Sequence, residues 1–131
     1  MARETPAERA QIIPPRAGLL HVVDAAGYSL AGLRRLLAET AARLELLGAL
    51  LVAVGFVWHG AAAWHWLAAG VLFALVLAAE ALNTAIEVLT DRISPEWSQT
   101  AKEAKDLGSF AVGVLLVATG GFVGLVLAGL I

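Results

Sequence analysis

The 131-residue chain contains no cysteine, which excludes disulfides, thiolate metal sites and a cysteine nucleophile. Charged residues are also few, at 15% of the chain, while hydrophobic residues reach 60%. The mean hydropathy of +0.80 exceeds that of an ordinary soluble domain. The sequence lacks a basic stripe with interleaved aromatic residues, so nucleic acid is not an expected partner. The composition therefore predicts a single-domain membrane protein.

The N-terminal segment lacks the apolar core of a signal peptide. Residues 1–19 combine charges with Pro14 and Pro15 and show no sustained period. We expect a flexible tail over 1–19 and assign 20–131 to one membrane domain.

An amphipathic helix is predicted at about 29–40, because leucines recur at helical spacing from position 30 and charged side chains fall between them. Ser29 is its expected N-cap. The basic residues Arg34 and Arg35 favour a helix that lies in the membrane interface. The alternative is a helix packed on the cytoplasmic end of the bundle.

Three apolar segments predict transmembrane helices at about 41–58, 64–82 and 109–131, and hence an all-α membrane protein. The first carries Arg43 and Glu45 in its first turns, and these charges must reach the interface or pair inside a bundle. The second helix is expected to continue to about residue 93, where the sequence Ser94-Pro95 ends it.

The connections between the spans are predicted from their composition. Tryptophans flank a turn at 59–63, as is common at a membrane interface. Polar residues are expected at such a boundary, and this explains His59 and His65 better than a metal site does. Residues 97–105 suggest a short interfacial helix. Gly120 and Gly124 form a GxxxG pair that is typical of helix packing.

Every lysine and arginine lies before the first span or between the second and the third. The positive-inside rule then predicts a cytoplasmic N-terminus, a cytoplasmic loop at 88–108 and a C-terminus on the opposite, periplasmic side.

A polar stripe marks the cytoplasmic end of the second span. Its members are spaced by three, four and four residues and share one helix face: Glu80, Asn83, Glu87 and Asp91. Carboxylates at this depth are costly unless they have a role or partners. Together with Glu39, such oxygen donors suit Mg²⁺, and a desolvated carboxylate suits a general base.

Lys105 could contact phosphate, so the residues of this end meet the minimum for phosphoryl transfer. Neither a GxxxxGK[ST] loop nor the HRD and DFG motifs of protein kinases are present. The residues by themselves leave three roles open: an enzyme, a proton or cation path, and a structural hydrogen-bond network.

The motif Glu80-Ala-Leu-Asn83-Thr-Ala-Ile-Glu87, followed by Asp91-Arg92 and by Ala104-Lys-Asp-Leu-Gly-Ser109, closely resembles the prokaryotic diacylglycerol kinase family. The resemblance covers about residues 20–131. It implies a homotrimer in the bacterial inner membrane, with composite active sites at the cytoplasmic interface. The implied reaction takes Mg·ATP and 1,2-diacylglycerol to phosphatidic acid and ADP.

The resemblance also assigns roles by position. Glu80 matches the catalytic base, Asn83 its support, and Glu39 and Glu87 the carboxylates that hold Mg²⁺ on the ATP phosphates. Lys105 would contact phosphate and Asp106 would hold the nucleotide site together. The remaining matches are nucleotide positions at Tyr28, Glu96, Trp97 and Ser98, and lipid positions at Ser29, Arg43 and Ser109.

Two other functions are also compatible with this sequence. One is a kinase of the same build that acts on a polyprenol such as undecaprenol. The other is a non-catalytic or ion-coupled membrane oligomer.

Overall fold

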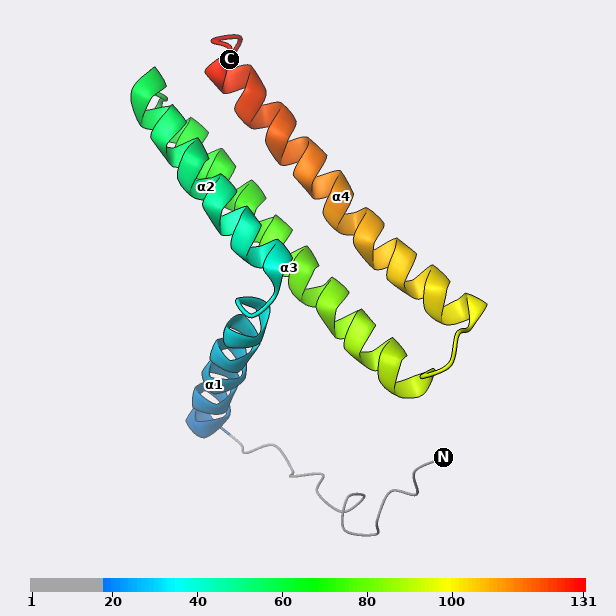
Figure 1. Ribbon diagram of the computed structural model, residues 1–131. Coiled ribbons are helices and arrows are strands. Elements are labelled where there is room, and N and C mark those ends of the chain that lie inside the picture. Colours follow the sequence, from blue (N-terminus) through cyan, green and yellow to red (C-terminus); the bar gives the residue numbers. More distant parts are fainter. Residues whose placement is uncertain (1–17) are drawn as a thin grey trace. The chain divides into compact units, whose positions relative to one another are not determined.

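The computed structural model describes residues 18–131, and these form four helices with connecting turns and no strand (Figure 1). The helices are α1 (Leu19–Leu36), α2 (Thr40–His59), α3 (Ala63–Ile93) and α4 (Gln99–Leu127). The expected tail at 1–19 falls almost wholly outside the described residues. Helices α2, α3 and α4 are each long and apolar enough to cross a membrane. The predicted all-helical membrane fold is therefore confirmed.

The chain divides into two units, 1–31 and 32–131. In the first unit, α1 begins directly after Gly18, which has a φ of 73°. The Ser29 hydroxyl donates a hydrogen bond to the Ala25 carbonyl at 3.0 Å, so Ser29 lies inside the helix. The prediction of a helix over 29–40 with Ser29 as its N-cap was wrong. No proline lies at positions 19–28, so the helix can extend upstream of Ser29 as far as Leu19.

In the second unit, α3 and α4 run antiparallel and pack on each other more extensively than either packs on α2 (Figure 1). As predicted, α3 ends before Ser94-Pro95. The Ser98 hydroxyl accepts a hydrogen bond from the Ala101 N–H at 3.2 Å and caps α4. Because of this cap, residues 99–105 are the first turns of α4. The expected separate helix at 97–105 was wrong, and the helix that contains most of the predicted span at 109–131 begins upstream of it, at Gln99.

The predicted turn between the first two spans is formed by a left-handed glycine. Gly60 has a φ of 72°, which glycine adopts without the steric cost of a Cβ. The Gly60 N–H donates to the Val57 carbonyl at 3.2 Å, and the Ala61 N–H donates to the Phe56 carbonyl at 2.9 Å. These two bonds form a Schellman motif, which ends α2.

The same end of the bundle contains the main cluster of buried side chains, formed by Phe56, Val123 and Val126. The Phe56 ring meets the Trp66 ring edge to face, with centroids 5.4 Å apart. His65 is also buried here, and its Nδ1 accepts a hydrogen bond from the Ala62 N–H at 3.0 Å. The expectation that a polar boundary explains His65 was incomplete, because the imidazole caps the start of α3.

Gly108 of α4 packs closely against Asn83 of α3. A Cβ added to Gly108 would overlap Asn83 Oδ1 and would lie 3.3 Å from Asn83 Cγ. By contrast, a Cβ at Gly120 or Gly124 would have no neighbour within 4 Å. The predicted GxxxG pair is therefore not a packing face within the described chain. Helices in a bilayer associate through such close packing rather than through hydrophobic burial, so Gly108 is the position that joins α3 to α4.

We predict that Gly108→Ala destabilises the protein whereas Gly113→Ala does not. The added methyl group displaces Asn83 in the first variant, and overpacking of this kind costs about 1–3 kcal/mol. At Gly113 the methyl group meets nothing within 4 Å, and alanine is the better helix former. Denaturation of the purified protein in detergent measures both variants. Equal stabilities would contradict the assignment of Gly108 as a packing position.

Candidate active site

Glu80 faces the interior of the second unit. It lies one helical turn from Val76 and one from Thr84, and all three side chains are buried along one face of α3. Glu80 is only 8% exposed. Because α3 is unbroken as far as Ile93, it also carries the rest of the predicted polar stripe. A carboxyl group in this position is withdrawn from water, which is the environment expected for a general base.

Asn83 connects the stripe to both helices. Its Nδ2 donates a hydrogen bond to Glu87 Oε1 at 3.1 Å, while its Oδ1 is buried against Gly108 and has no hydrogen-bond partner. Asn83 is thus bonded to Glu87 in this structure, and its support of Glu80 stays a prediction. Glu87 is exposed, and a carboxylate oriented by an amide is a suitable oxygen ligand for a hard cation.

Lys105 of α4 pairs with Asp91 of α3, and Lys102 pairs with Asp106 one turn along α4. Asp91 is therefore bound across the two helices. The Lys105 and Asp91 side chains are 37% and 68% exposed. An ion pair this exposed contributes at most about 1 kcal/mol, so an anionic ligand can replace Asp91 at low cost.

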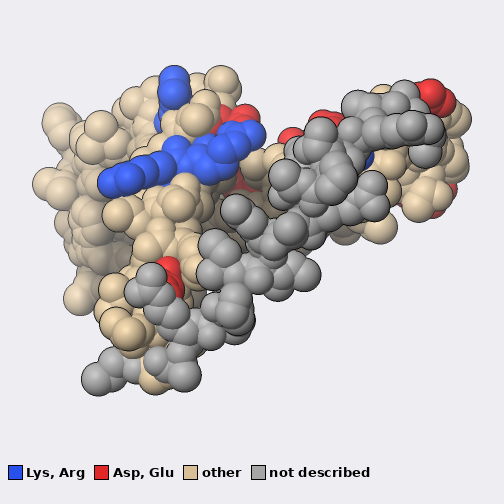
Figure 2. Space-filling model, turned by 90° about the horizontal axis from the view of Figure 1, so that it is seen from below, with Lys and Arg blue, Asp and Glu red and all other residues tan. Residues whose placement is uncertain are grey.

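The connection between α1 and α2 is polar. Arg35 forms an ion pair with Glu39, and Arg43 Nε donates a hydrogen bond to the Leu37 carbonyl at 2.8 Å. Arg43 thus turns back to the backbone at the helix end, one of the two outcomes expected for a charge in this span. Figure 2 shows Lys and Arg side chains gathered on the face seen from below, with Asp and Glu side chains beside them.

Within residues 18–131, no three His, Cys, Asp or Glu side chains gather as a metal site. Of the two predicted Mg²⁺ ligands, Glu39 directly precedes α2 and Glu87 lies near the end of α3. Both offer carboxylate oxygens, which are the donors that Mg²⁺ prefers. The donor chemistry therefore fits the cation.

The predicted nucleotide positions fall on the turn between α3 and α4. Glu96 and Trp97 are exposed there, and Trp97 is 79% exposed. Ser98 caps α4, and the Ser94 hydroxyl donates to it at 3.0 Å. Ser98 therefore has a structural role that the sequence analysis did not assign.

The predicted lipid positions are exposed where the structure describes them. Ser109 follows Gly108 on α4 and is exposed, as is Arg43 on α2. Tyr28 and Ser29 are exposed on the part of α1 that belongs to the first unit.

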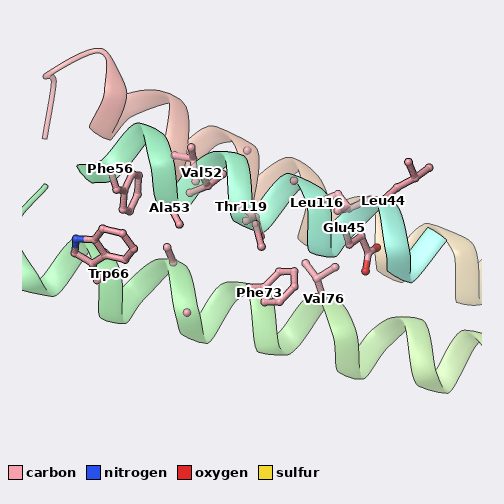
Figure 3. A pocket seen from close by; sticks show the side chains of 16 residues that line it. Leu44, Glu45, Val52, Ala53, Phe56, Trp66, Phe73, Val76, Leu116 and Thr119 are labelled. Carbon is pink, nitrogen blue, oxygen red and sulfur yellow. The ribbon is translucent and has the colours of Figure 1, made fainter. Parts of the chain in front are cut away.

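A cavity of about 520 Å³ lies between α2, α3 and α4 (Figure 3). Its lining is apolar, with Thr119 and Glu45 as the exceptions, and Glu45 is the one charged side chain in it. Figure 3 shows the Glu45 carboxyl group directed toward α3 beside Val76. There it meets the Glu80 carboxyl group at hydrogen-bonding range.

Glu45 was not among the predicted site residues. From the sequence, Glu45 was expected only to reach the membrane interface or to pair inside a bundle. The sequence feature that could have indicated a site role is that Glu45 is a charged residue between leucines in the first span.

A family profile described as "Prokaryotic diacylglycerol kinase" matches residues 27–127. A diacylglycerol kinase from Sinorhizobium sp is 45% identical over 108 residues, which is 82% of this chain and 79% of that protein. The diacylglycerol kinase of Pseudomonas aeruginosa is 41% identical over 103 residues, or 77% and 83% of the two chains. That of Escherichia coli K12 is 37% identical over 101 residues, or 76% and 83%.

The family profile covers α2 and α3 completely and α4 to its last residue, and the relatives match most of their own length. The matched region contains the buried Glu80, the Asn83–Glu87 pair and Lys105. This three-span membrane enzyme belongs to the prokaryotic diacylglycerol kinase family.

Proposed function

We propose that the protein transfers the γ-phosphate of ATP to the hydroxyl group of 1,2-diacylglycerol and forms phosphatidic acid and ADP. The observation that carries this proposal is Glu80, a buried carboxyl group beside an apolar cavity and on the same helix as the Asn83–Glu87 pair. The family membership and the names of the relatives support the same reaction.

Glu80 acts as the general base in this proposal. It takes the proton from the lipid hydroxyl as the hydroxyl oxygen bonds to the γ-phosphorus, and the bond from that phosphorus to the β,γ-bridging oxygen breaks. The electron pair of that bond leaves with ADP. Proton transfer of this kind contributes roughly 10²–10⁴-fold to a rate.

The nucleotide lies at the ends of α3 and α4 in this proposal. Lys105 exchanges its exposed partner Asp91 for phosphate oxygens, and Asp106 helps to shape the same end of α4. Glu39 and Glu87 would hold Mg²⁺, which supplies charge neutralisation on the phosphates when it is bound. Tyr28, Glu96, Trp97 and Ser98 are the further nucleotide positions, and Ser29, Arg43 and Ser109 contact the lipid.

We also propose a homotrimer with composite sites, with the N-terminus in the cytoplasm and the active site at the cytoplasmic face of the inner membrane. Two observations support it. Within residues 18–131 of one chain, no group of three or more His, Cys, Asp or Glu side chains that could hold a metal ion includes Glu39 or Glu87. On α4, Gly113 and Gly124 share one helix face and have no neighbour within 4 Å of their Cβ positions. Such a face permits close packing of another helix.

The reaction is tested by the transfer of radiolabel from [γ-³²P]ATP to lipid in mixed micelles with Mg²⁺. We expect labelled phosphatidic acid from short-chain diacylglycerol and little product from undecaprenol. Preferential labelling of undecaprenol would replace diacylglycerol by a polyprenol as the acceptor. If neither lipid is labelled, the polar stripe has a transport or structural role instead.

We predict that Glu80→Gln lowers turnover by roughly 10²–10⁴-fold because the amide cannot accept the proton. Assembly and ATP affinity should stay largely intact, since the variant preserves size and hydrogen bonding. Glu103→Gln is the matched control, because Glu103 is an exposed carboxylate on α4 that pairs only locally with Gln99. More than about a tenth of the wild-type rate in Glu80→Gln would exclude the assignment as base.

Glu87→Gln is expected to raise the Mg²⁺ concentration for half-maximal rate by about tenfold or more, since it removes a carboxylate ligand. A magnesium titration of the initial rate measures this shift, with Glu103→Gln again as the control. A titration curve identical to that of the wild type would argue against a metal role for Glu87.

A further inference from the structure

The Glu45 and Glu80 carboxyl groups form a contact that the proposed reaction does not by itself require. Glu45 lies in the first turns of α2 and Glu80 in the middle of α3. The Glu45 carboxyl group points toward α3 beside Val76, and Glu80 lies one turn further along the same buried face (Figure 3). Glu45 lines the apolar cavity, and its carboxyl group interacts with that of Glu80.

The hydrogen-bonding groups near Glu45 determine how it can contact Glu80. Glu45 Oε2 is buried and has no hydrogen-bond donor beside it among the described residues. The group that faces it is a second carboxyl group, which is also an acceptor when it is ionised. A proton placed between the two carboxyl groups satisfies both, whereas two carboxylates at this range repel each other.

The other helices around Glu45 bring no competing charge. On α4, the side chains that line the cavity include Leu116, Thr119 and Val123, which carry none. The Thr119 hydroxyl is already used, because it donates to the Leu115 carbonyl at 2.7 Å. On α3, Glu80 is the charged group that acts on Glu45.

We infer that Glu45 is a positioning residue that keeps its proton and donates a hydrogen bond to the Glu80 carboxylate. This inference rests on the proposed function, in which Glu80 must be ionised to act as the base. The bond fixes the Glu80 side chain beside Glu45 and leaves its other oxygen free to receive the proton of the lipid hydroxyl.

Substitutions of Glu45 in the full-length protein separate this role from packing. Glu45→Gln retains a donor, because the amide N–H replaces the acid O–H, and its kcat should stay close to that of the wild type. Glu45→Leu has no donor, and its kcat should fall by about 10- to 100-fold with the KM for ATP little changed. Glu103→Gln, the same change at an exposed carboxylate of α4 that pairs locally with Gln99, is the control and should leave kcat unchanged.

The pH dependence of kcat provides a readout that a structural role would not change. The wild type should lose activity at alkaline pH as Glu45 loses its proton and the two carboxylates repel. Glu45→Gln cannot lose that proton, so this alkaline decline should disappear. An alkaline decline that is the same in both proteins would overturn the inference.

Infrared spectroscopy tests the proton directly and does not depend on activity. The difference spectrum of wild type minus Glu45→Gln at neutral pH should contain the carbonyl band of a protonated carboxylic acid, and wild type minus Glu103→Gln should not. Absence of this band, or a Glu45→Leu variant with full kcat, would overturn the inference. Failure of the proposed function is distinct, because the wild type would then label neither lipid.

Discussion

The close contact of α3 with α4 at Gly108 is the interaction on which the rest of the site depends. It brings the α4 backbone against the Asn83 amide, whose other end is bonded to Glu87. The same pairing puts Lys105 of α4 beside Asp91 of α3. Polar groups within a bilayer are stable only when the protein supplies their partners. Because α4 supplies partners for these polar groups, α3 can contain carboxyl groups both in its buried middle and at its exposed end.

The packed cluster and the cavity of the second unit share residues. The rings of Phe56 and Trp66 meet edge to face near the turn between α2 and α3, where His65 caps the start of α3. Phe56, Trp66 and Val123 also line the apolar cavity, whose lining extends to Glu45 near the start of α2 (Figure 3). The same side chains therefore contribute both to the packing of the bundle and to the wall of the cavity.

Local features of this fold could be predicted from the sequence, because they depend on residues a few positions apart. Helical periodicity put Glu80, Asn83 and Glu87 on one helix, and Ser94-Pro95 marked the end of that helix correctly. The pairing of Lys102 with Asp106 was also readable, since residues four apart meet on a helix and adjacent residues do not. The start of α4 could have been recognised from Ser98 as a cap.

Contacts between distant positions could not be predicted in the same way. The meeting of Glu45 with Glu80 and the fit of Asn83 against Gly108 depend on how the helices are rotated and shifted relative to one another. Periodicity shows which face of a helix a residue occupies but not which residue of another helix lies opposite. The face of a helix on which a polar residue lies was therefore predictable, and its contacts with other helices were not.

The cavity between α2, α3 and α4 has a consequence for how a lipid acceptor is supplied. Its apolar lining belongs to helices that span the bilayer, so an acyl chain within it remains in surroundings similar to those of the membrane interior. The acceptor then arrives by lateral diffusion and never crosses water. Its supply is governed by its mole fraction among the surrounding lipids, as for a solute in a two-dimensional solvent, while ATP is supplied from a three-dimensional one.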